Sequence, residues 1–117
     1  MSYKKLDCWN LAIELVETVY GITSAFPDKE KFNLISQINR SAVSIPSNIA
    51  EGSARQSDKE MIQFLYVALG SIAELETQLI ISQKLGYAVQ NDIYDKIVDV
   101  RKLIIGLVKY LKSKKDK

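Results

Sequence analysis

The chain has 117 residues, of which 47% are hydrophobic and 26% charged, with one cysteine, no histidine and a formal net charge of +2. This length suits a single domain spanning residues 1–117, and the apolar fraction excludes wholesale disorder. The lone cysteine excludes an internal disulfide and a multi-cysteine metal cluster, and the lack of histidine removes the commonest general base and metal ligand.

The first predicted helix runs from about Asp7 to Ala25, where Phe26-Pro27 ends it. Charges at Asp7 and Glu14 exclude the uninterrupted apolar core of a signal peptide, and no stretch approaches the 18 to 20 apolar residues of a membrane span. We therefore expect a cytoplasmic protein without a membrane partner. The predicted core stripe of this helix is Trp9, Ala12, Ile13, Val16, Val19 and Tyr20, with Leu11, Leu15 and Ile22 continuing around its side.

The second predicted helix runs from near Asp28 to about Glu51. Pro46 lies inside it and predicts a kink or a break, because proline removes a backbone donor and clashes with the preceding turn. The apolar spacing continues across Pro46, which favours one kinked helix, and Gly52 is interpreted as its C-terminal cap. Its seam consists of Ile35, Ile38, Ala42, Ile45 and Ile49.

The third predicted helix begins at a capping box, Ser57 with Glu60, and runs to about Leu85, where Gly86 closes it. It carries two apolar stripes. One is Met61, Leu65, Ala68, Ile72, Leu75 and Leu79, and the other is Ile62, Tyr66, Leu69, Ala73 and Ile80, interrupted by Glu76.

The fourth predicted helix begins near Asn91 and extends into the lysine-rich tail, with a seam of Ile93, Ile97, Val100, Ile104, Leu107 and Leu111. Short connections between the four helices predict an all-α, up-down-up-down antiparallel four-helix bundle. A helix in a monomeric bundle needs only one apolar face, so the second stripe favours homo-oligomerisation over a merely generous core.

Positive charge is concentrated in the tail. Residues 101–117 hold seven basic residues and one acid, whereas residues 1–100 hold nine basic and thirteen acidic residues. The preferred interpretation of this tail is a solubilising helix end favoured by the macrodipole, and the alternative is a site for an anionic partner, either nucleic acid or a membrane surface. The candidate binding residues of the tail are Lys109, Lys112, Lys114 and Lys115.

A line of polar residues follows the second helix at spacings of three and four: Arg40, Ser44, Asn48, Glu51 and Arg55. Serine and asparagine weaken a helix interior, so their short side chains indicate close approach by another helix, a subunit or a ligand. One interpretation is a structural hydrogen-bonded network, with Glu51 paired to Arg55 or Arg40. The other is a recognition surface for a polyanion or a protein partner.

Catalysis is not expected. Carboxylate-bridged metal sites in helical bundles use Glu-x-x-His motifs, which this chain lacks, so neither a metal nor a cofactor is predicted. Glu74 and Glu76 lie two apart on a helix and point in different directions. Cys8 has no histidine to activate it and is interpreted as a small packed hydrophobe.

Several motifs of the chain resemble one known family. They are the run from Ser44 to Gly52 (Ser-Ile-Pro-Ser-Asn-Ile-Ala-Glu-Gly), Gln37-x-x-Arg40, Arg55, Ser57-x-x-Glu60, Gly70-Ser71-x-x-Glu74-Leu75-Glu76-x-Gln78 and Leu85-Gly86-Tyr87. They are similar to those of the bacterial four-helix-bundle proteins first noticed as reading frames in 23S rRNA intervening sequences. The resemblance implies a ring-shaped homopentamer. A related branch, the accessory proteins of diversity-generating retroelements, binds nucleic acid and a reverse transcriptase through a basic ring, from which this chain departs by its acidic body.

Together these observations predict a non-enzymatic, oligomeric helical-bundle protein that binds RNA, DNA or a nucleic-acid-processing protein. The rival is a structural or protein-interaction module without a nucleic-acid role. It predicts that Arg40, Glu51 and Arg55 are buried at a bundle corner or a subunit interface.

Overall fold

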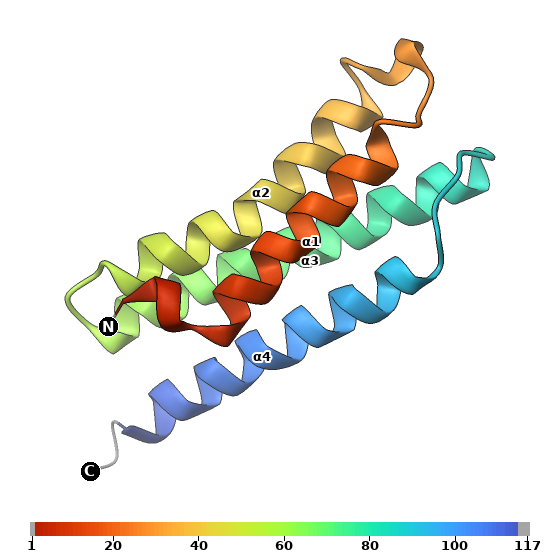
Figure 1. Ribbon diagram of the computed structural model, residues 1–117. Helices are drawn as coiled ribbons and strands as arrows, with labels where there is room; N and C mark the ends of the chain where they lie inside the picture. The colour runs from red at the N-terminus through yellow and green to blue at the C-terminus, as the bar shows by residue number, and fades with distance from the viewer. Residues whose placement is uncertain (1, 115–117) are drawn as a thin grey trace.

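The computed structural model describes residues 2–114, which form four long helices and two short 3₁₀ turns. The helices are α1 (Asp7–Thr23), α2 (Leu34–Ser53), α3 (Asp58–Lys84) and α4 (Asp92–Lys114), and the turns η1 (Tyr3–Lys5) and η2 (Asp28–Glu30) precede α1 and α2. Each helix packs on the next and α4 packs on α1, in alternating directions (Figure 1). The predicted all-α, antiparallel bundle is confirmed.

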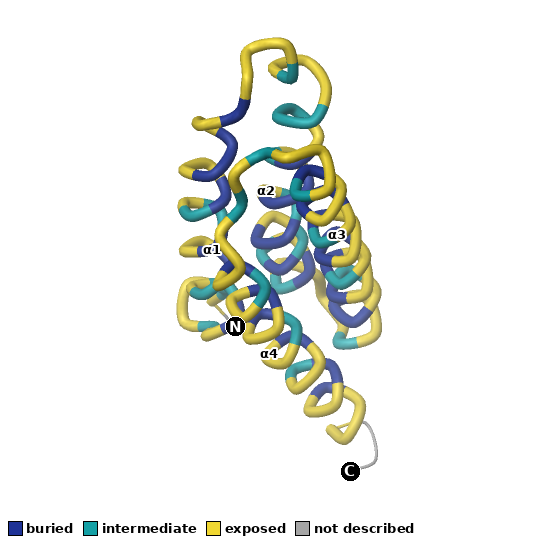
Figure 2. The backbone as a smooth tube through the Cα atoms, turned by 90° about the vertical axis from the view of Figure 1, so that its right-hand side faces the viewer, coloured by how far each residue is buried: buried dark blue, intermediate teal, exposed yellow. Residues whose placement is uncertain are grey.

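The buried side of each helix faces the bundle axis (Figure 2). On α2, α3 and α4 it follows the predicted seams closely, with Val108 more buried than Leu107 on α4. The prediction for α1 was right for Ala12 and Val19 and wrong for the rest of the stripe, because the core side is Cys8, Ala12, Leu15, Val19 and Ile22. Trp9, Ile13, Val16 and Tyr20 lie beside this seam and are half-buried or exposed. Both stripes have helical spacing, so periodicity alone does not indicate which one faces the core.

The predicted start of α2 near Asp28 was also wrong, since the helix begins at Leu34. Residues 28–30 form η2 instead, where the Glu30 amide donates to the Pro27 carbonyl at 2.9 Å. Asn33 then leaves the helical region at φ −119° and ψ −105°. Beyond Leu34, α2 continues through the buried Pro46 without a break, as the apolar spacing predicted, and a bend of its axis there stays a prediction.

Gly52 is not the C-terminal cap that the sequence predicted. It lies inside α2, is buried, and has no positive φ. A Cβ atom at this position would lie 2.8 Å from Phe64 Cβ and 3.3 Å from the Met61 carbonyl oxygen. Its function is therefore to let the end of α2 approach the start of α3 closely.

Both predicted ends of α3 are confirmed. The Ser57 hydroxyl accepts a hydrogen bond from the Glu60 amide at 3.2 Å, which confirms Ser57 as the N-cap. The Glu60 carboxylate accepts from the Ser57 hydroxyl at 3.2 Å and not from the Ser57 amide that a full capping box uses. At the other end Gly86 has φ +91°, its amide donates to the Gln83 carbonyl, and the Tyr87 amide donates to the Ser82 carbonyl at 3.0 Å. These two bonds form a Schellman motif, which requires the left-handed backbone that glycine adopts at little cost.

α3 is long and apolar enough, by length and composition, to cross a membrane, contrary to the expectation that no stretch would be. Its first stripe packs in the centre of the bundle, and long core helices commonly have such a composition. Glu76, which interrupts the second stripe, pairs with Arg101 of α4 at 3.0 Å. These contacts place one side of the helix in the packed interior of the bundle.

Candidate nucleic-acid interface

The structure divides the polar line of α2 into an internal part and an exposed part. Ser44 and Asn48 are half-buried between α2 and α3. The hydroxyls of Ser44 and Ser71 lie 2.8 Å apart, and the Asn48 side-chain amide donates to the Ser44 carbonyl and hydroxyl at 2.8 and 2.9 Å. For Ser44 and Asn48 these contacts support the structural interpretation, since they satisfy polar groups between the two helices.

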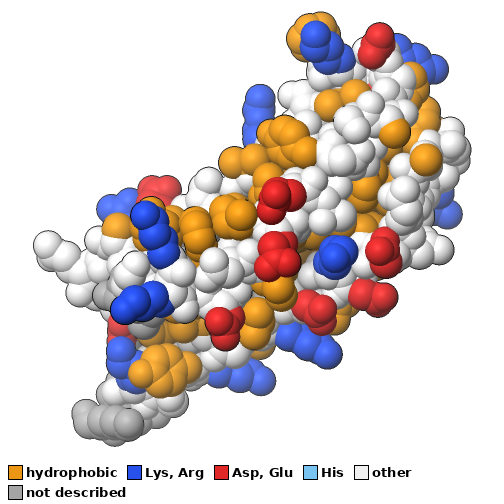
Figure 3. All heavy atoms as spheres, viewed as in Figure 1, with side chains coloured by type: hydrophobic (Ala, Val, Ile, Leu, Met, Phe, Trp, Pro, Cys, Tyr) orange, Lys and Arg blue, Asp and Glu red, His pale blue; other side chains and the backbone are white. Residues whose placement is uncertain are grey.

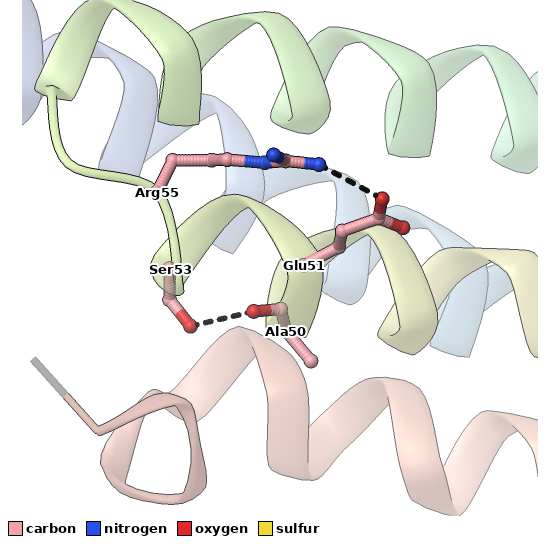
Figure 4. A network of polar contacts seen from close by, with 4 residues as sticks. All are labelled: Ala50, Glu51, Ser53 and Arg55. Carbon is pink, nitrogen blue, oxygen red and sulfur yellow. Dashed lines mark hydrogen bonds and ion pairs between the residues drawn. The ribbon is translucent and has the colours of Figure 1, made fainter.

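Glu51 and Arg55 form the exposed part at the end of α2. The Arg55 guanidinium donates to the Glu51 carboxylate at 3.1 Å, with the Ser53 hydroxyl bonded to the Ala50 carbonyl beside them (Figure 4). The guanidinium also lies 4.7 Å from the centre of the Phe64 ring. The sequence predicted that Glu51 pairs with Arg55 or Arg40, and in the structure it pairs with Arg55. Both side chains of this ion pair are accessible to solvent.

Arg40 lies apart from this pair. It precedes Arg55 by fifteen residues, which corresponds to roughly 22 Å along a helix. It is exposed at a cleft of about 370 Å³ between α2 and α3, lined also by Gln37, Ser41, Ser44, Glu74 and Gln78. The five residues of the predicted line therefore do not form one binding surface.

The tail lysines lie beside aromatic rings at the end of the bundle where α4 terminates. Lys112 Nζ lies 5.4 Å from the Tyr66 ring centre, and Lys114 Nζ lies 5.5 Å from that of Tyr110. Lys114 also pairs with Asp58 at 3.4 Å, which links the end of α4 to the start of α3. Lys109 is exposed one turn earlier, and Lys115 lies outside the described residues.

Sequence reasoning missed several residues that fold onto this same end, which we call the basic end. It holds the described parts of both chain termini and the α2–α3 turn (Figure 1), and several basic side chains gather there on the face that Figure 3 shows. Residues 2–7, 51–60 and 109–114 contain seven basic and four acidic residues, whereas the opposite loops, residues 24–33 and 84–96, contain equal numbers. The additional members are Lys4, Lys5, Lys59, Phe64, Tyr66 and Tyr110.

Two apolar surfaces lie on opposite sides of the bundle. The first is a groove of about 290 Å³ between α1 and α2, lined by Tyr3, Trp9, Ile13, Val16, Val43, Pro46, Ser47 and Ala50. The second lies on α3 and α4, where exposed apolar side chains include Ile80, Val98 and Ile105. Contiguous exposed apolar side chains often mark surfaces that contact another protein.

Cys8 is packed in the core with 3% of its surface exposed, as predicted for a small hydrophobe. Burial raises the pKa of its thiol from 9.0 to about 11. Among residues 2–114, no cluster of three or more His, Cys, Asp or Glu side chains is arranged to hold a metal ion.

We expect Cys8 to react with iodoacetamide at pH 8 at least about a hundredfold more slowly in the native protein than in urea. The raised pKa alone lowers the thiolate fraction by roughly that factor, because each pKa unit is tenfold and the thiolate is the nucleophile. Mass spectrometry of timed, quenched samples measures the rate. Equal rates in the two states would contradict the packed position.

The family comparison agrees with this architecture. The model of the 23S rRNA-intervening sequence protein family matches residues 4–109. This range covers most of the chain, including α1, α2, α3 and the greater part of α4. The chain belongs to this family. A search of curated proteins found no significant match. Membership confirms the resemblance seen in the sequence motifs, and the match includes Lys4, Lys5, Arg55 and Lys59 of the basic end.

Proposed function

We propose that this chain is a non-enzymatic, cytoplasmic protein that assembles into a homo-oligomer and binds nucleic acid through its basic end. The observation that carries the proposal is the grouping of Arg55, Lys112 and Lys114 with the rings of Phe64, Tyr66 and Tyr110. Basic side chains beside accessible aromatic rings are the features that single-strand-binding proteins use for phosphates and bases.

Exposure of the rings supports this proposal. Tyr66 is 44% exposed and Tyr110 is 54% exposed, so part of each ring is available for stacking. Two of the four acids of the basic end are engaged locally, since Asp58 pairs with Lys114 and Glu51 with Arg55. Surface pairs of this kind contribute little energy, so a phosphate can replace either carboxylate at small cost.

The two apolar surfaces support self-assembly. They are different surfaces on opposite sides of the chain, so a contact between them is head-to-tail and not two-fold symmetric. Repetition of such a contact gives a closed ring when the rotation allows it. A ring agrees with the homopentamer that the family resemblance implies, and it would place the basic ends of all copies at one rim.

The test is binding of a fluorescently labelled RNA hairpin with a single-stranded loop, measured by anisotropy at 0.1 M salt. The triple variant Arg55→Ala/Lys112→Ala/Lys114→Ala is expected to bind at least about tenfold more weakly than the wild type. A matched triple variant at the opposite end, Lys29→Ala/Lys31→Ala/Lys84→Ala, loses the same charge and is expected to bind almost as the wild type does.

The single variant Arg40→Ala provides a further control, because Arg40 lies far from the basic end along α2. Wild-type affinity no better than micromolar, or equal losses in the two triple variants, would sink the proposal. The first result means that RNA is not bound specifically, and the second means that only net charge matters.

A protein-interaction module without a nucleic-acid role is the second candidate, and the internal bonds of Ser44 and Asn48 favour it. Arg40, Glu51 and Arg55 are exposed in the single chain, so burial at a bundle corner does not apply to them. The testable version of this second candidate is that these three side chains become buried where two subunits meet. It predicts that Arg40→Ala and Arg55→Ala lower the melting temperature or the mass of the assembly, measured by thermal melts and light scattering.

A further inference from the structure

The cleft between α2 and α3 has an unusually polar floor. Ser41 and Gln78 lie at this floor and are 4% and 8% exposed, respectively. Residues between two packed helices are ordinarily apolar, because a buried polar group is costly unless it is hydrogen-bonded. Polar side chains from both helices nevertheless converge on this one cleft.

Three acceptor oxygens surround a single hydroxyl at this floor. The Ser41 hydroxyl lies 3.0 Å from the Gln37 carbonyl oxygen, 3.0 Å from Gln78 Oε1 and 3.2 Å from Glu74 Oε1. A hydroxyl has one proton and donates it to one acceptor at a time. The remaining lone pairs of the Glu74 and Gln78 oxygens can therefore accept from a ligand that brings several N–H donors.

The rim of the cleft carries two opposite charges that are not joined to each other. Arg40 and Glu74 are both exposed and both line the cleft, and no ion pair between them is found within residues 2–114. A guanidinium presents five donors in a planar fork that matches a carboxylate. The cleft thus offers one site for an anionic group and another for a cationic group.

We propose that this cleft binds a small zwitterion, an α-amino acid. Its carboxylate pairs with Arg40, and its ammonium group donates to the oxygens of Glu74 and Gln78. The volume of about 370 Å³ lies in the range of small-molecule sites and has room for a side chain beyond the two charged groups. Gln37 and Ser44 line the rest of the cleft, so a polar side chain fits it better than an apolar one.

The experiment uses the full chain and the twenty common L-amino acids, each at 5 mM and neutral pH. Differential scanning fluorimetry is expected to show a rise in melting temperature of several degrees for at least one polar amino acid, because a ligand that binds only the native state stabilises it. Isothermal titration then measures the dissociation constant of that amino acid. We expect it to rise at least about tenfold in Arg40→Gln and in Glu74→Gln, since each variant removes one of the two charges.

Two matched variants control for loss of a surface charge. Lys102→Gln on α4 and Glu17→Gln on α1 are exposed and lie outside the cleft, so they are expected to bind as the wild type does. The proposal is overturned if no amino acid shifts the melting temperature, or if binding survives unchanged in both Arg40→Gln and Glu74→Gln. If Ser41→Ala unfolds at a lower temperature than the wild type, and no amino acid shifts the melting temperature of the wild type, the polar side chains of the cleft floor serve only to hold α2 and α3 together.

Discussion

Replacing Gly52 by alanine is expected to lower the free energy of unfolding by about 2 kcal/mol, the largest single-residue loss of stability that we predict. The new Cβ would lie 2.8 Å from Phe64 Cβ, an atom fixed to the α3 backbone, and 3.3 Å from the Met61 carbonyl oxygen. Neither group can rotate away, so α2 and α3 must separate. Urea denaturation at a fixed protein concentration measures the change.

Two other helical glycines are matched controls. At Gly21 and Gly106 no atom lies within 4 Å of the place that a Cβ would occupy, so alanine is accommodated there without a clash. Gly21→Ala and Gly106→Ala are expected to raise stability by up to about 1 kcal/mol, because alanine favours the helix. If Gly52→Ala were as stable as these two variants, the close approach of α2 and α3 would not require glycine.

The second large effect is expected on assembly. The wild type is expected to sediment at micromolar concentration as a homopentamer, five times the 13.2 kDa of the chain. Ile13→Glu/Val43→Glu places two charges in the apolar groove between α1 and α2, and burial of unpaired charges is costly. We expect this variant to sediment as a monomer at the same concentration, with its helical circular dichroism retained.

Gln63→Glu is a single-charge control, since Gln63 is exposed on α3 and does not line the groove between α1 and α2. It is expected to assemble as the wild type does. A wild type that sediments as a monomer would mean that the exposed apolar surfaces do not pair with each other. An assembled Ile13→Glu/Val43→Glu variant would mean that the groove is not the contact.

Much of the fold could be predicted from the sequence because local signals coincide with helix ends. The Ser57 N-cap and the Gly86 Schellman motif mark the two ends of α3 through bonds between residues close in sequence. The start of α2 was missed because residues 28–30 are compatible with either an α-helix or a 3₁₀ turn. Gly52 was misread because a close approach to Phe64 depends on tertiary packing.

The candidate sites were less predictable, because they depend on residues far apart in the sequence. Spacing of three and four residues placed Arg40 and Arg55 on one helix, but the structure separates them into the α2–α3 cleft and the basic end. Lys112 beside Tyr66 joins two different helices, which no local pattern indicates. The core face of α1 was partly misassigned, because Leu15 and Ile13 belong to neighbouring stripes of similar composition.

The salt dependence of RNA binding tests the central claim most directly. Each phosphate contact releases counterions, so the logarithm of the association constant should fall linearly with the logarithm of salt concentration. We predict that Arg55→Ala/Lys112→Ala/Lys114→Ala reduces the magnitude of the wild-type slope by about 2 to 3, and that Lys29→Ala/Lys31→Ala/Lys84→Ala leaves it unchanged. A wild-type slope near zero, or the same slope in the wild type and the basic-end variant, would contradict nucleic-acid binding through the basic end.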